Sequence, residues 1–271
     1  MNNNFGFLRL VFALLVILAH SPEMIDGNRD REILTRLTGS MSFGELAVDG
    51  FFLISGYLIT QSFERSSSVF EYVTKRVLRI YPGFIVAFVI LLLVVVPLGG
   101  GHIDPSGSFL GKAIYNLAIL SPLQVDGVFE GLAYPFLDAP MWTIPYEFRC
   151  YLLVVVFAAI GLNRHRAVYA GITAGLLGLA AFGVHYELGP VARITGQLQE
   201  LCRLLSVFMV GGVYSLSRDV VRYAWRIAGF AAILLPLLLM TPPLAETAWA
   251  VLGGYLVFWF AFQVRSDWMQ N

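Results

Sequence analysis

A histidine and two carboxylates stand at the ends of the first two apolar stretches of the chain. His20 closes the first stretch, and Glu45 and Asp49 open the second, "ELAVDGFFLISGYLIT", where they share one helix face. If the stretches form consecutive antiparallel helices, Asp49 lies at the depth of His20. A carboxylate there orients the imidazole and raises its basicity. We therefore predict that His20 is a general base held by Asp49, and that Glu45 is solvated.

A third titratable group belongs to the stretch "APMWTIPYEFRCYLLVV". Glu147 lies near the outer end of the helix that this stretch begins, so we expect it in the same layer as His20 and Asp49. Trp142 and Tyr146 are typical of a membrane interface and are candidates for binding a substrate beside that carboxylate. The predicted catalytic residues are therefore His20, Asp49 and Glu147.

Basic residues gather on the opposite side of the predicted membrane, in "EYVTKRVLRIYPGF". Arg76 and Arg79 share one helix face, where two forked guanidiniums suit a phosphate or pyrophosphate; an ordinary anchor to the inner leaflet is the alternative. Arg9 precedes His20 by about 16 Å along a helix and so belongs to this inner side. Ser55, next to a glycine, allows a slender ligand to pass. A donor with a charged head and a long thin tail fits this arrangement.

Composition restricts the class of protein. The chain has 271 residues, of which 58% are hydrophobic and only 13% are charged, and its mean hydropathy is +0.73. The apolar residues form blocks long enough to cross hydrocarbon as helices, without the alternation of a membrane barrel. We therefore predict an all-α polytopic protein of the lipid bilayer. A net charge of zero gives no indication of nucleic acid as a partner, and the spacing of cysteines and histidines predicts no metal site.

Eight apolar blocks are long enough to be membrane crossings. They are 5–21, 46–63, 81–98, 144–161, 167–184, 201–217, 225–241 and 246–264. The first block resembles a secretory signal, but because seven further blocks follow it we predict a retained span.

A ninth apolar piece, 111–123, is shorter and contains Asn116. If it crossed the membrane, the arginines of the later loops would lie outside, against the positive-inside rule. We therefore predict that 111–123 is a re-entrant or interfacial helix within one long outer segment, 99–143. In this topology both termini are cytoplasmic and the protein lies in the cell membrane.

Four separated motifs together resemble the acyltransferase-3 family of integral membrane O-acyltransferases. In the order that the family shows them, they are "LRLVFALLVILAH", "VDGFFLISGYLI", "KRVLRIYP" and "MWTIPYEFRCYLL". With the less specific "SVFMVGGVYSL" they extend from residue 7 to about residue 217. The family implies one membrane domain over 1–271. It typically has ten spans, and because this sequence ends where the last two would begin, the resemblance implies a C-terminally short copy.

The resemblance also implies an activity. Members of the family are similar in moving an acetyl or other acyl group from cytoplasmic acyl-CoA to a hydroxyl of a cell-surface sugar. By that resemblance the donor is acetyl-CoA or another acyl-CoA, and the acceptor is a saccharide or glycolipid. His20 would then activate the acceptor hydroxyl. Arg76 and Arg79 would hold the phosphates of CoA, and Glu147 would shape the outer site.

Two other functions fit parts of the sequence. Charges within the membrane and a helix broken at Ser55 and Gly56 suit an exporter of a saccharide or small acid, although no inverted repeat is visible. A chain without the last two spans also fits an inactive copy. The acceptor sugar, the acyl chain and the oligomeric state are left open by the sequence.

Overall fold

The chain forms a bundle of helices, which a computed structural model describes for residues 3–103, 106–135, 139–181 and 198–264. The longer helices are α1 (Phe5–Asp26), α3 (Phe43–Glu64), α4 (Val69–Ile90), α6 (Gly107–Ala118), α7 (Ile144–Ala159), α8 (Arg166–Ala181), α10 (Leu198–Leu216), α11 (Trp225–Leu239) and α13 (Gly254–Gln263). Short pieces join them: α2 (Ile33–Thr38), α5 (Val96–Leu98), α12 (Pro242–Ala248), the 3-10 turns η1 (Arg29–Arg31), η3 (Ala139–Thr143) and η4 (Leu162–Arg164), and the π-helical turns η2 (Leu91–Val95) and η5 (Trp249–Gly253). The described residues contain no strand, so the predicted all-α class is confirmed.

Five helices are long and apolar enough to cross a membrane, and the predicted count of eight spans is not confirmed. The five are Phe5–Asp26, Phe43–Glu64, Val69–Leu98, Met141–Ala159 and Pro242–Gln263. The described part of α8 has 16 residues, and residues 182–184 of its predicted block lie outside the described residues. α11 has 15 residues, fewer than the roughly 20 that hydrocarbon requires. The described part of α10 has 19 residues, carries Glu200 and Arg203, and is largely covered by other helices.

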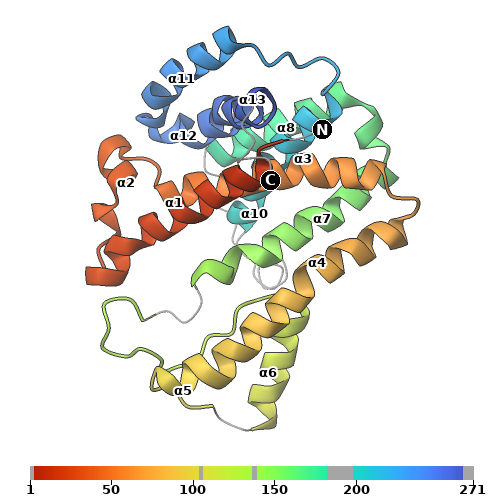
Figure 1. The fold of residues 1–271 in the computed structure, drawn as a ribbon. Coiled ribbons are helices and arrows are strands. Elements are labelled where there is room, and N and C mark those ends of the chain that lie inside the picture. The colour runs from red at the N-terminus through yellow and green to blue at the C-terminus, as the bar shows by residue number, and fades with distance from the viewer. Residues whose placement is uncertain (1–2, 104–105, 136–138, 182–197, 265–271) are drawn as a thin grey trace.

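The short helix predicted near 111–123 is present as α6, which begins at Gly107 and ends at Ala118. Its twelve residues extend only about 18 Å, too little to cross hydrocarbon. α6 lies beside α4, and its Ala113 joins a buried cluster with Phe84 and Phe88 of that helix (Figure 1). Leu120, in the left-handed backbone region at φ 58°, follows the end of α6 and turns the chain.

The closest helix contact of the fold joins α3 to α10 through two glycines. A Cβ on Gly56 would lie 1.9 Å from the carbonyl oxygen of Phe208, and one on Gly211 would lie 2.1 Å from that of Leu53. Only residues without side chains allow two backbones to approach this closely. The glycine of the Ser-Gly pair in the second apolar stretch therefore serves packing against α10.

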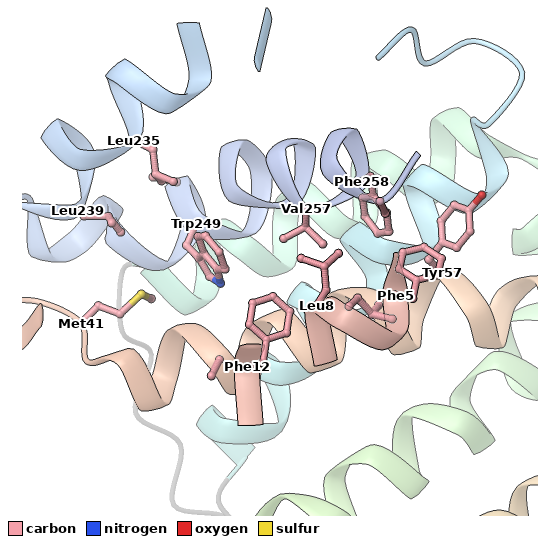
Figure 2. Packing of buried hydrophobic residues seen from close by; sticks show 14 of the residues in the cluster. Phe5, Leu8, Phe12, Met41, Tyr57, Leu235, Leu239, Trp249, Val257 and Phe258 are labelled. Atoms are coloured by element: carbon pink, nitrogen blue, oxygen red, sulfur yellow. The ribbon is translucent and has the colours of Figure 1, made fainter. Parts of the chain in front are cut away.

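A second core joins α1 to the helices that end the described chain. Phe5, Leu8 and Phe12 of α1 pack against Val257 and Phe258 of α13 (Figure 2). At the end of this contact, the Asn4 backbone N–H donates to the Ala261 carbonyl at 3.1 Å, and the Asn4 side chain donates to the Val264 carbonyl at 2.8 Å. The start of α1 and the end of α13 therefore lie on the same side of the bundle.

Candidate active site

Glu147 is half-buried between α3 and α7. Its Oε1 accepts hydrogen bonds from Ser55 Oγ, at 3.1 Å, and from the Tyr151 hydroxyl. Ser55 lies on α3 and Tyr151 on α7, so the carboxylate ties the two helices together. Glu147 is in the first turn of α7, where the helix dipole favours a negative charge.

The predicted placement of Glu147 in one layer with His20 and Asp49 is wrong. Its partner Ser55 lies six residues further along α3 than Asp49, which is about 9 Å deeper. Glu147 lies in the first turn of α7, and its hydrogen bond to Ser55 sets this depth.

Three arginines surround the inner side of Glu147, and we name Arg9, Arg76 and Arg79 the arginine cluster. The charges of Arg79 and Glu147 both act on Arg9, which places residues of α1, α4 and α7 together. Arg76 lies over the rings of Tyr72 and Tyr151, 5.8 and 5.9 Å from their centroids, and donates to Ser62 Oγ at 3.2 Å. Within the described residues, the arginine cluster makes no ion pair with a carboxylate. Its positive charge is therefore available to an anionic ligand.

His20 lies in the second half of α1, which continues to Asp26, and its partner is not Asp49. His20 Nδ1 is 3.1 Å from Glu23 Oε2, one turn further along the same helix. A carboxylate therefore does orient the ring, but it comes from α1 itself. Nε2 has no hydrogen-bond partner among the residues that the structure describes.

Asp49 instead binds Arg203, a residue that the sequence analysis did not single out. Asp49 Oδ1 accepts a hydrogen bond of 2.6 Å from Arg203 Nη1. The same Nη1 is 3.4 Å from Glu246 Oε1, and Arg203 Nε donates to Glu200 Oε2 at 3.0 Å. The cause is the close α3–α10 contact, which turns Asp49 toward α10 and away from α1. The available signal was an arginine inside the apolar block 201–217, because charges within such blocks are rare and functional.

A cavity of about 620 Å³ opens beside His20, and we name it the outer pocket. Its walls come from α1, α3, the loop after α6 and the start of α7. The lining residues used below are His20, Arg29, Glu45, Trp142 and Arg203, with Ala13, Phe51 and Thr143 at its inner end. A smaller cavity of about 250 Å³, the side pocket, shares Arg29, Glu45, Trp142 and Arg203 with it and adds Glu200 and Glu246.

The inner end of the outer pocket points toward Glu147 and the arginine cluster. Ala13 lies one helical turn from Arg9 on α1, and Phe51 lies one turn from Ser55 on α3. Thr143, the N-cap of α7, likewise lies one turn from Glu147. Each step is about 6 Å along its helix. Three helices therefore lead from the pocket to the same group of charges.

The two aromatic residues proposed for substrate binding have different surroundings. Trp142 lines both pockets and leaves 38% of its surface exposed. Tyr146 is buried beneath it, with the two rings edge to face at 5.8 Å, and Arg149 lies 5.2 Å from the Tyr146 ring centre. Trp142 is thus positioned to contact a ligand, whereas Tyr146 supports Trp142.

Comparison with known proteins identifies the family of the chain. The sequence pattern of the acyltransferase domain family matches residues 2–269. The chain belongs to this acyltransferase-3 family. No solved structure gives a significant match.

Three curated proteins are similar to parts of the chain. An O-acetyl transferase of Shigella phage Sf6 is 30% identical over 58% of this chain and 46% of its own length. Nodulation protein 10 of Rhizobium leguminosarum bv. viciae is 27% identical over 69% of this chain and 52% of its own length. The acyltransferase MdmB of Streptomyces mycarofaciens is 28% identical over 54% of this chain and 36% of its own length. The chain therefore matches between 36% and 52% of the length of these relatives.

Proposed function

We propose that the protein is a membrane-embedded O-acyltransferase that moves an acetyl or other acyl group from acyl-CoA to a hydroxyl of a saccharide. The observation that carries this proposal is the alignment of the outer pocket with the arginine cluster. A pocket that holds a histidine ends one helical turn from Arg9, Ser55 and Glu147, which come from three different helices. Family membership and relatives named O-acetyl transferase and acyltransferase support it.

The donor binds through its phosphates at the arginine cluster. Arg79 is exposed, and two further guanidiniums within reach of one anionic group provide charge-assisted hydrogen bonds. The thin pantetheine arm then extends between α1, α3 and α7, past Ser55 and Glu147. This route brings the thioester through the inner end of the outer pocket toward His20.

The acceptor saccharide lies across the outer pocket and the side pocket, which share four lining residues, and places a hydroxyl near His20. Nε2 of His20 removes the hydroxyl proton as the oxygen attacks the thioester carbonyl carbon, and Glu23 stabilises the imidazolium that forms. The new carbon–oxygen bond completes the ester, and the carbon–sulfur bond breaks. His20 returns the proton to the departing thiolate, which leaves as free CoA.

This chemistry requires the two substrates to approach from opposite sides of the bilayer. The arginine cluster would then face the cytoplasm and His20 the outside of the cell membrane. Both ends of the described chain lie together on one side of the bundle, which fits a topology with both termini in the cytoplasm. The acceptor is then a saccharide or glycolipid of the cell envelope.

A sided assay in proteoliposomes tests the proposal. Radiolabelled acetyl-CoA is supplied on the side of Arg79 and a saccharide acceptor on the side of His20, and label transfer and CoA release are followed. We expect His20→Ala to lower transfer by about a hundredfold or more. His102→Ala, which changes an exposed histidine, is the matched control and should transfer like the wild type. Unchanged transfer by His20→Ala would remove the proposed base.

A further inference from the structure

Arg203 offers an unused donor to the two pockets. Its side chain is only 10% exposed and lines both of them. Nη1 and Nε are occupied by Asp49, Glu246 and Glu200. Nη2 has no hydrogen-bond partner in the described part of the chain. A buried guanidinium fixed by three carboxylates is therefore a pre-organised donor for a ligand group.

Carboxylates outnumber arginines around this guanidinium. Of the described residues, two arginines line the side pocket, Arg29 and Arg203. Three glutamates line it as well, Glu45, Glu200 and Glu246, and Asp49 lies directly behind Arg203. With these groups ionised, the wall carries excess negative charge. In a partly enclosed site such charge repels an anionic ligand and attracts hydroxyl and ammonium donors.

Trp142 completes the side pocket with an exposed ring that Tyr146 holds from beneath. An aromatic face packs against flat, apolar surface, and its negative potential attracts polarised C–H groups. One face of a pyranose ring presents such C–H groups, while hydroxyls surround its edge. The side pocket thus combines a ring-sized platform with a donor and several acceptors.

We propose that the side pocket is the subsite for the acceptor sugar, and that it takes a neutral or amino-substituted pyranose and discriminates against acidic sugars. The inference rests on the proposed function in assigning the sugar the role of acyl acceptor. Trp142 stacks on the ring, Arg203 Nη2 donates to a ring hydroxyl, and Glu45 and Glu246 accept from hydroxyl or ammonium groups. A carboxylate on the sugar meets the same two glutamates and is repelled.

Direct binding tests the proposal without depending on acyl transfer. Saturation-transfer NMR on the full chain in lipid nanodiscs compares the methyl β-glycosides of glucose, glucosamine and glucuronic acid. We expect the first two to bind and the glucuronide to bind at least about tenfold more weakly at low ionic strength. Equal or tighter binding of the glucuronide, or failure of all three to bind, would overturn the proposal.

Charge-neutralising variants test which residues discriminate. Glu45→Gln with Glu246→Gln keeps the amide oxygens as acceptors but removes two charges, and should strengthen glucuronide binding by about tenfold. Glu45→Gln also keeps the capping box with Ser42, which protects the start of α3. Glu130→Gln changes an exposed glutamate that lines neither pocket and should leave the glucuronide affinity unchanged. Unchanged glucuronide binding in the double variant would contradict the assignment.

Arg203→Gln should weaken binding of all three sugars, but it also deprives Asp49 of its partner. Trp142→Ala supplies a second variant without that effect, and it should weaken glucoside binding by about tenfold or more. Glucoside binding equal to wild type in Trp142→Ala would overturn the stacking role.

The two proposals fail in different ways. Sugar binding with the expected preference but no transfer would end the proposed function and leave the subsite intact. Transfer with a preference for the glucuronide would support the acyltransferase and end the subsite.

Discussion

Asp49 Oδ1 lies 2.6 Å from Arg203 Nη1, and this contact joins α3 to α10. The two residues are 154 positions apart in the sequence. The backbones of α3 and α10 meet at Gly56 and Gly211, further along the same two helices. The ion pair and the glycine contact therefore form one unit. That unit fixes the wall between the outer pocket and the side pocket, because Arg203 lines both.

Asp49→Asn should lower stability and leave the pH dependence of transfer unchanged. The variant removes one of the three carboxylate charges around Arg203, which still pairs with Glu200 and Glu246. We therefore expect the free energy of unfolding to fall by about 2 to 3 kcal/mol. Thermal unfolding in detergent measures the first effect, and a pH–rate profile measures the second. Normal stability with a displaced pH profile would mean that Asp49 acts on His20 after all.

Gly56→Ala should separate α3 from α10. The added Cβ would lie 1.9 Å from a backbone oxygen that cannot move aside. We therefore expect the free energy of unfolding to fall by about 3 kcal/mol or more. Gly171→Ala on α8 is the control, because its Cβ would meet nothing within 4 Å. That change should be neutral or slightly stabilising in the same unfolding measurement. Equal stability of the two variants would refute the close contact.

Arg79→Ala should weaken binding of the acyl donor and leave the rate of the chemical step nearly unchanged. Loss of one guanidinium from the arginine cluster should raise KM for acetyl-CoA by about tenfold or more with little change in kcat. Lys75→Ala, on the same helix but paired with Glu71, is the control and should leave KM near the wild-type value. A fall in kcat at unchanged KM would place Arg79 in the reaction step instead.

Tyr151→Phe and Glu147→Gln should have non-additive effects on stability. The Tyr151 hydroxyl donates to Glu147, so we expect a coupling energy of about 1 kcal/mol between the two changes. Tyr81→Phe provides the comparison, because that hydroxyl donates to the Ala118 carbonyl on α6. Its effect should add to that of Glu147→Gln. Additivity in both cycles would argue against the Tyr151–Glu147 contact.

The sequence predicts where a residue lies along its helix better than it predicts the partner of that residue. The positions of His20 on α1 and of Arg76 and Arg79 on α4 follow from residue number, because depth along a helix changes regularly. The partner of Asp49 depends on which helix lies beside α3. Antiparallel neighbours in sequence suggested α1, whereas the glycine contact selects α10.

The depth of Glu147 and the number of spans were beyond the sequence for a similar reason. Apolar blocks have the same composition whether lipid or protein covers them, so the block 201–217 does not reveal that α3, α7 and α8 pack around α10. The long outer segment before Glu147 predicts a position near the surface. The hydrogen bond from Ser55 that sets the depth of Glu147 gives no periodic signal in the sequence.

In the proposed mechanism the acyl group passes from the side of the arginine cluster into the outer pocket, over a distance of one helical turn. Ala13→Phe would fill the inner end of the pocket, and Leu14→Phe adds a ring to the adjacent exposed position, which does not line the pocket. The measurement is transfer from acetyl-CoA to a saccharide in proteoliposomes, together with acetyl-CoA binding. We predict that Ala13→Phe loses transfer by about a hundredfold but binds acetyl-CoA normally, and that Leu14→Phe retains both. Equal transfer by the two variants would contradict the account.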